Sequence, residues 1–306
     1  MNCPGNAIII GRVGAYCGSV HYSKEECWVT DNAIVAYTKS GSDPRYAYYH
    51  MRNLNLNNHR IGSGQPLLTQ RILEEIRSTL PQPKEQVAIS SLLGALDDKI
   101  AANDWVLRTS SDLSESLYRQ LVMNATSAKS LGDLIELKYG KALPAADRVD
   151  GQFPVYGSGG VSGTHNIALV KGPGVVVGRK GTVGAVYWSE KGFFPIDTTF
   201  YVELRGDRIP MEFAFYMLKH LGLENMNSDS AVPGLNRSNA LSLQAKVPNE
   251  AALQTFHEEV RPLFALRESL AEQSASLAEL RDTLLPRLMS GEIRMRDAEK
   301  VVEKVT

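Results

Sequence analysis

The sequence predicts an α+β fold in which two β-rich globular domains, related by an internal repeat, are joined by two long antiparallel coiled-coil-like helices. Three observations lead to this prediction. The 306-residue chain matches itself at a nearly constant offset, strand-type runs occur in each copy, and a leucine-rich helical pattern follows each set of strands. A chain of this length also exceeds the size at which one hydrophobic core usually stops growing, which favours two domains.

The internal repeat becomes visible when residues 11–37 are aligned with residues 178–204. The glycines that open the two segments then coincide at an offset of 167 residues. The same offset returns far downstream, in the helical part of the chain, where Leu117 coincides with Leu284. A register kept over so long a stretch indicates a duplicated domain together with its connector.

The repeat divides the chain into four segments. In its frame Met1 aligns with Ala168, so the first domain is expected to lack a counterpart of residues 129–167. In the second copy, β-branched and aromatic runs are separated by glycine-rich turns, which is typical of strands. The expected segments are a first domain at 1–84, a spacer helix at 85–128, a second domain at 129–249, and a spacer helix with a tail at 250–306.

Two leucine patterns predict the long helices. Apolar residues recur at steps of three and four residues within 89–121 and again within 253–288, which places them on one face of a helix. Helices of roughly 35 residues are longer than is usual in globular domains, which favours coiled-coil packing. The alternative is that each helix packs only on its own domain. The expected spacer and partner-binding leucines are Leu92, Leu96, Leu113, Leu117, Leu263, Leu277 and Leu284.

The charge balance excludes a strongly basic chain, because the formal net charge is −1. The charge is nevertheless unevenly distributed. The two domains carry net charges of +3 and +2, and each helical segment carries −3. This distribution favours domains that face a polyanion and helices that face protein partners.

Cysteine usage and hydropathy indicate the cellular compartment of the protein. Three cysteines without a CxxC pair argue against a disulfide framework or a zinc site and favour a reducing cytoplasm. No apolar stretch approaches the roughly 20 residues of a membrane span, and the start of the chain has no charged region typical of a signal peptide. A cytoplasmic protein without metal, cofactor or membrane contact is therefore expected.

Glycine-rich turns carry the candidate DNA contacts. Glycine lets the backbone approach a phosphate closely, arginine can read guanine with two hydrogen bonds, and asparagine pairs well with adenine. The alternative is that these are ordinary hairpin turns, in which glycine, serine, asparagine and lysine are common for conformational reasons. The expected DNA-binding residues are Arg12, Lys138, Lys141, Tyr156, Ser158, Arg179, Lys180, Thr182, Asn236 and Arg237.

No catalytic motif is found in the sequence. A P-loop, a helix-opening dinucleotide fingerprint, an H-E-x-x-H zinc motif and a G-x-S-x-G nucleophile elbow are all missing. Asp31 and Asp197 share one position of the repeat, which is more typical of a turn or hydrogen-bonding role than of a catalytic carboxylate. We therefore expect no catalytic residues.

Four segments together resemble the specificity subunit of type I restriction-modification systems. KSLGDLIELKYGKAL at 129–143 and VVVGRKGTVGAVYW at 175–188 resemble parts of its recognition domains. LPQPKEQVAISSLLGALDDKI at 80–100 is similar to the central conserved region of that family, and LAELRDTLLPRLMSGEI at 277–293 to its C-terminal one. The resemblance covers nearly the whole chain. The missing counterpart of residues 129–167 departs from the family pattern and puts base reading by the first domain in doubt.

The resemblance implies a function without chemistry of its own. Each recognition domain would read one half of a bipartite double-stranded DNA target, and the paired helices would set the gap between the halves. The helices would also dock two methyltransferase subunits, which methylate adenine, and a restriction and motor subunit would join the complex. The alternatives are a β-rich nuclease, or a scaffold that binds methyltransferase subunits without full DNA specificity.

Overall fold

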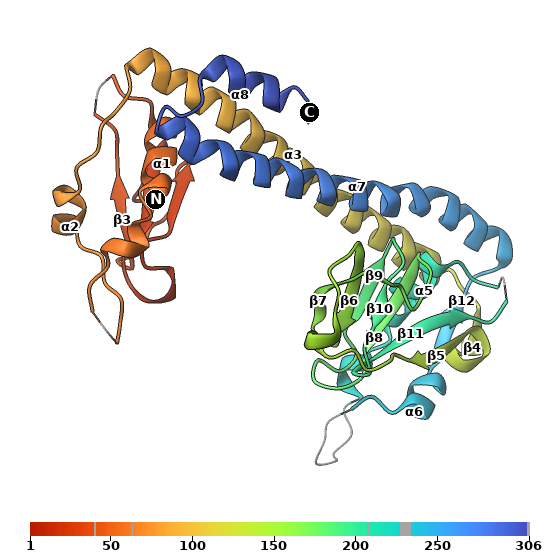
Figure 1. Ribbon diagram of the computed structural model, residues 1–306. Helices are drawn as coiled ribbons and strands as arrows, with labels where there is room; N and C mark the ends of the chain where they lie inside the picture. Colours follow the sequence, from red (N-terminus) through yellow and green to blue (C-terminus); the bar gives the residue numbers. More distant parts are fainter. Residues whose placement is uncertain (40, 63, 207, 227–233, 305–306) are drawn as a thin grey trace. The chain divides into compact units, whose positions relative to one another are not determined.

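The computed structural model describes the whole chain except residues 40, 63, 207, 227–233 and 305–306. The chain forms two compact units, one made of Met1–Asp104 with Ala271–Thr306 and the other of Trp105–Leu270. Each unit combines a β-rich domain with part of each of two long helices, α3 (Pro83–Met123) and α7 (Glu250–Met289), as Figure 1 shows. The predicted α+β class with two domains and two long helices is confirmed.

The domain of the first unit is built on a three-stranded antiparallel sheet in the order β2-β1-β3. Alternation along β1 points Ile8 and Ile10 into a core that also contains Leu68. Asp43 caps the start of helix α1, because its carboxylate accepts the N–H of Tyr46 at 2.6 Å. The elements are β1 (Ala7–Gly11), β2 (Val20–Ser23), β3 (Ala33–Ala36), α1 (Pro44–Asn53) and α2 (Gln70–Glu75).

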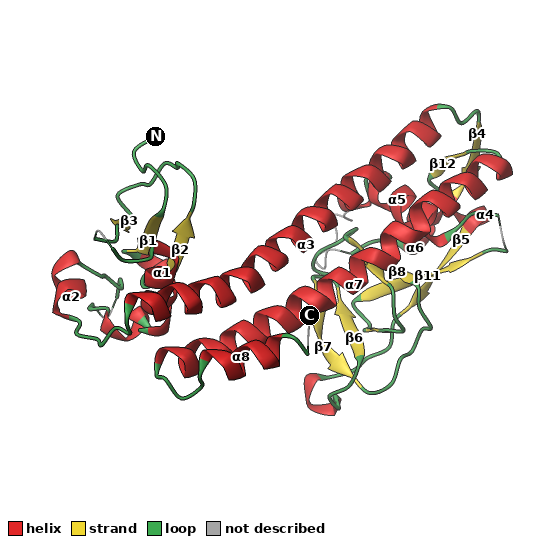
Figure 2. Cartoon of the chain, turned by 90° about the horizontal axis from the view of Figure 1, so that it is seen from above, coloured by secondary structure: helices red, strands yellow, loops and turns green. Residues whose placement is uncertain are grey.

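The domain of the second unit is larger. Its main sheet is antiparallel in the order β5-β11-β8-β9, and the strands β5, β11 and β8 lie side by side in Figure 2. A second sheet has the order β10-β6-β7, and β12 pairs with β4. The elements are β4 (Ser127–Ser130), α4 (Leu131–Leu134), β5 (Ile135–Tyr139), β6 (Phe153–Gly157), β7 (Gly160–His165), β8 (Gly174–Gly178), β9 (Val186–Ser189), β10 (Phe194–Pro195), β11 (Thr199–Leu204), α5 (Met211–His220), α6 (Arg237–Leu241) and β12 (Gln244–Val247).

The internal repeat is confirmed by the positions of the elements that both copies contain. The starts of β1 and β8, of α1 and α5, of α2 and α6, and of α3 and α7 are each 167 residues apart. Single hydrogen bonds repeat as well. The Leu68 N–H donates to the Arg12 carbonyl at 2.8 Å, and the Leu235 N–H donates to the Arg179 carbonyl at 2.8 Å. Within the described residues, no element of the first domain corresponds to β4–β7.

The long helices pack together as an antiparallel pair. In the first unit, Asp97 of α3 pairs with Arg281 of α7, and Asn103 donates to the Gln273 side chain at 2.9 Å, so later positions on α3 meet earlier positions on α7. After α7 the chain turns back into α8 (Met295–Val302), whose Ala298 is buried. Among the described residues, no helix is long and apolar enough to cross a membrane.

The apolar stripe of α3 differs in one place from the predicted leucines. Leu96, Leu277 and Leu284 are buried, and Leu92, Leu117 and Leu263 are half-buried, but Leu113 is 48% exposed. The buried positions on this part of α3 are instead polar, namely Ser110 and Ser114. The spacing of three and four residues between buried positions continues through these serines. The prediction considered leucines alone and therefore placed Leu113, instead of Ser114, on the buried face.

Leu284→Ala is expected to lower the free energy of unfolding of the first unit by about 2–5 kcal/mol, because a buried leucine loses its packing and leaves a cavity. Leu113→Ala removes the same atoms from an exposed position and should change stability by no more than about 0.5 kcal/mol. Urea unfolding with hydrogen-exchange readout of each unit measures both. Equal losses for the two variants would contradict the packing described here.

An ion-pair cluster anchors α7 to the second domain. Arg261 pairs with Glu190 at the end of β9 in a bidentate manner, one of its two hydrogen bonds being 2.9 Å long. Arg261 also lies 3.7 Å from Glu212, which is nearly fully buried and contacts His257 at 3.0 Å. The hydrogen bond from Arg261 lowers the pKa of Glu190, although burial opposes the shift and the Trp188 indole N–H supports it.

This shift predicts an acid-sensitive contribution to stability. A carboxyl whose pKa is lower in the folded state stabilises the protein above its ordinary pKa of 4.5, and the contribution is lost as the pH falls through the folded-state value. Glu190→Gln is expected to cost about 1.5–3 kcal/mol at pH 7 and progressively less below pH 4.5. Chemical unfolding at several pH values measures the difference, and Glu259→Gln, at an exposed position of α7, is the matched control.

Candidate DNA interface

The loop between β8 and β9 presents two polar side chains on a tight turn. Its backbone closes through hydrogen bonds from the Gly178 N–H to Ala185 and from the Gly184 N–H to Gly178, at 2.8 and 2.9 Å. Glycine is required at position 178, because a Cβ there would lie 2.1 Å from the Thr182 carbonyl oxygen. The turn leaves Lys180 and Thr182 exposed.

Four segments far apart in the sequence meet around this turn. The Lys141 N–H donates to the Pro195 carbonyl at 3.1 Å, and the Lys180 N–H donates to the Thr198 carbonyl at 3.1 Å. Ser158 lies beside the same turn, because a Cβ on Gly181 would be 3.0 Å from its hydroxyl. We call the surface formed by the exposed residues Lys141, Lys180, Thr182 and Asn236 and the half-buried Ser158 the turn surface.

Two of the predicted arginines are held by the protein itself. Arg179 donates to the Asp197 carbonyl at 2.7 and 3.2 Å, and its guanidinium lies 5.2 Å from the centre of the Tyr139 ring. Arg237 donates to the Leu137 carbonyl at 2.7 Å and to the Glu136 carboxylate at 2.9 Å. Both guanidinium groups therefore fasten β5 and its surroundings, and base reading by Arg237 would require it to leave these partners.

Tyr156 is not a surface residue. Its side chain is only 7% exposed, its ring packs against Phe193, and its hydroxyl donates to the Trp188 carbonyl at 3.1 Å. The sequence suggested a flexible glycine-rich loop here, whereas Tyr156 belongs to strand β6 and points inward. A DNA contact through this side chain is inconsistent with its burial.

Asn236 has a local structural role that also occurs in the first domain. Its side-chain oxygen accepts the Asn239 N–H at 3.1 Å and caps α6. The equivalent Thr69 accepts the Ile72 N–H at 3.3 Å and caps α2. Helix capping is therefore a sufficient reason for a polar residue at this position, even in the absence of DNA. The cap uses only the side-chain oxygen, so the amide NH2 group of the exposed Asn236 is still able to donate a hydrogen bond to a base.

Among the predicted lysines, Lys138 is neutralised locally. It lies 3.1 Å from Glu136 and 3.7 Å from Glu203. The hydrogen bond from Lys138 is the main cause of a lowered pKa of Glu136, and Arg237 adds to it. Within the part of the chain that the structure describes, the side chains of Lys141 and Lys180 make no ion pair. They are the cations of the turn surface that are available for an anionic ligand.

Two further residues complete the comparison. Arg12, the counterpart of Arg179 in the first domain, is exposed at the end of β1. Tyr139, which stands between the candidate residues Lys138 and Lys141 in the sequence, is 53% exposed and lies beside Arg179 and Arg237.

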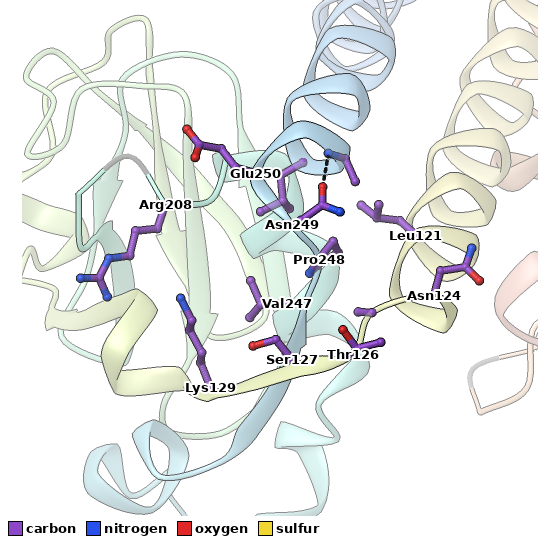
Figure 3. A pocket seen from close by; sticks show the side chains of 13 residues that line it. Leu121, Asn124, Thr126, Ser127, Lys129, Arg208, Val247, Pro248, Asn249 and Glu250 are labelled. Carbon is purple, nitrogen blue, oxygen red and sulfur yellow. Dashed lines mark hydrogen bonds between the residues drawn. The ribbon is translucent and has the colours of Figure 1, made fainter.

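A separate cavity of about 610 Å³ lies where α3 ends and α7 begins, and Figure 3 shows its lining. Lys129 and Arg208 line it together with Glu250, which offsets part of their charge. The Asn249 side chain accepts the Ala252 N–H at 2.9 Å and so caps α7. None of the residues predicted to bind DNA lines this cavity.

Comparisons with known proteins identify the family to which this chain is similar. The family described as type I restriction modification DNA specificity domain matches residues 1–104 and 126–255. The EcoprrI type I restriction enzyme specificity subunit from Escherichia coli is 31% identical over 93 residues, which are 30% of this chain and 23% of that protein. The match thus spans less than a quarter of the length of this relative.

One solved structure shows the same fold. The S subunit of a type I restriction-modification system from M. genitalium superimposes with a TM-score of 0.72 at 20% identity, covering 94% of this chain and 83% of that chain. The HsdS subunit from Thermoanaerobacter tengcongensis gives a TM-score of 0.36 at 14% identity, covering 95% and 82%. Because the family matches both copies of the repeat and more than half of the residues, this chain belongs to the family of type I restriction-modification DNA specificity domains.

Proposed function

We propose that this protein is the non-catalytic, DNA-binding specificity subunit of a type I restriction-modification complex in the cytoplasm. The second domain reads one half of a bipartite double-stranded target through the turn surface. The observation that carries this proposal is that Lys141 and Lys180 are exposed and make no ion pair within the described chain, while the Ser158 hydroxyl lies beside the turn that carries Lys180 and Thr182. Cations and hydroxyls on tight turns are suited to phosphate contacts, which position a protein on DNA.

The helix pair is the proposed docking surface for methyltransferase subunits. The segments that contain α3 and α7 carry an excess of acidic side chains, which disfavours DNA and leaves them available to protein partners. The methyltransferase subunits would methylate adenine at the site that the specificity subunit selects, and a restriction and motor subunit would complete the assembly.

Co-expression with a methyltransferase subunit of a type I system from the same genome tests this function. We expect a stable complex that methylates adenine in a plasmid at a target split into two halves, while neither protein methylates alone. Sequencing of modified bases on the plasmid identifies the target. A contiguous target, or a failure of the two proteins to associate, would contradict the proposal.

A further inference from the structure

Strand β3 of the first domain has one unpaired edge among the described residues. It pairs with β1 on one side, in the register Ile10 with Ile34, and the sheet ends there. In the second domain the equivalent strand β11 pairs on both sides, with β8 in the register Val177 with Phe200 and with β5. Ile34 therefore corresponds to Phe200, and the place next to β3 corresponds to the place that β5 occupies.

Strand β3, which has the open edge, is shorter than its counterpart β11. β11 has six residues and β3 has four. The last two residues of β11, Glu203 and Leu204, pair with β5, so the extra length of β11 lies where β5 supports it. Phe200 is fully buried, whereas its counterpart Ile34 is only half-buried although it packs on the core of the first domain.

The hydrogen-bonding groups on this edge can be assigned from the neighbouring strand. On the side of β2, the Gly11 N–H donates to the Ser19 carbonyl and the Gly11 carbonyl accepts the Gly18 N–H. On the side of β3, the N–H of Arg12 donates to the Asn32 carbonyl at 2.8 Å. Since antiparallel strands alternate the direction of their backbone groups, Ile34 faces β1 and Val35 directs its N–H and carbonyl away from β1.

A groove runs along the same edge. It has a volume of about 630 Å³ and is lined by β3, by the start of α2, and by Arg12 and Asp31. In the second domain the counterparts of two lining residues hold β5. Arg179, the counterpart of Arg12, lies against Tyr139, and Arg237, the counterpart of Gln70, donates to the Leu137 carbonyl.

We propose that this groove binds an extended segment of a separate polypeptide, which adds to β3 as an antiparallel strand. The partner is a different chain whose recognition-domain opening segment has the alternating pattern of Ile135–Tyr139. A second copy of this protein does not qualify, because its Ile135–Tyr139 is already paired with β11. In the register of the second domain, the tyrosine of the incoming strand lies opposite Ile34 and its leucine opposite Ala36. The added strand would form hydrogen bonds with the outward backbone groups of β3 and would bury Ile34. Arg12 and Gln70, at the rim of the groove, would contact the end of the incoming strand.

A labelled synthetic peptide with the sequence of residues 131–142, LGDLIELKYGKA, is the probe. With the full chain we expect saturable binding by fluorescence anisotropy and slower hydrogen exchange at residues 33–38. Val35→Pro removes the outward N–H and leaves the bonds to β1 in place, so the peptide should bind at least tenfold more weakly. Val35→Thr keeps the N–H and a β-branched side chain, and binding should stay within about twofold of the original.

Three results would overturn the proposal. These are no binding, equal binding to the Val35→Pro variant, or protection confined to residues 199–204, which would mean that the peptide displaces β5. Concentration-dependent protection of residues 33–38 in the chain alone would identify a second copy as the occupant and would also overturn it. Arg12→Ala, on the rim of the groove, provides a second test that does not alter β3. We expect this variant to bind the peptide several-fold more weakly. The assay contains neither DNA nor methyltransferase, so its outcome is independent of the proposed function.

Discussion

Phe264→Ala is expected to lower the free energy of unfolding of the second unit by about 3–5 kcal/mol, as is typical of a phenylalanine removed from a core. Phe264 is 1% exposed and lies on α7. Its ring centre is 4.5 Å from that of Trp188 and 5.7 Å from that of Phe215, both in edge-on arrangements. The substitution removes both aromatic contacts and leaves a cavity between α7 and the domain that it supports.

Hydrogen exchange of the β8 amides under native conditions measures this loss within the second unit. Leu266→Ala is the matched control, because Leu266 lies two residues further along the same helix and is 40% exposed. The control should change stability by no more than about 0.5 kcal/mol. If Phe264→Ala leaves the exchange of β8 unchanged, α7 does not stabilise the second domain in the way described.

Replacing Lys141 and Lys180 together by alanine is expected to weaken DNA binding of the complex on the order of 10–100-fold, whatever the sequence of the DNA. Each lysine lost from a phosphate contact should reduce the slope of log K against log salt by about one. The double variant should therefore show a slope smaller by about two. Specificity should be unchanged, because phosphate contacts carry no base information.

Titrations of target and non-target DNA at several salt concentrations measure both quantities. A double variant at Lys171 and Lys246, which are exposed outside the turn surface and outside α3 and α7, removes the same net charge and serves as the control. If the two double variants lose affinity equally, the effect comes from net charge alone. The turn surface would then not be the place of contact.

Substitutions of Arg237 and Asn236 change the structure of the second domain as well as any DNA contact. Arg237→Ala removes the hydrogen bonds to Leu137 and Glu136, so any loss of DNA binding would include a disturbed β5. Asn236→Ala removes a helix cap, and Asn236→Ser keeps a capping oxygen while it removes the amide. Comparing these two Asn236 variants separates base reading from helix capping.

The sequence by itself determined the repeat, the class of fold and the extent of the long helices. These features depend on local patterns, namely β-branched runs between glycine turns and apolar residues at steps of three and four, and such patterns act over a few residues. Helices α3 and α7 therefore span the apolar patterns within 89–121 and 253–288 that predicted them. The turn with Lys180 and Thr182 was also predictable, because Gly178 and Gly181 set its geometry locally.

Only the tertiary structure decided which polar residues are available. Arg179, Arg237 and Tyr156 look like surface contacts in sequence, yet their partners Asp197, Leu137 and Trp188 are 18, 100 and 32 residues away along the chain. In the same way, the open edge of β3 follows from what pairs beside it and not from the composition of β3. A hydrogen-bonding group is free or satisfied according to the groups that the fold brings next to it, and a local pattern carries no information about neighbours so distant in sequence.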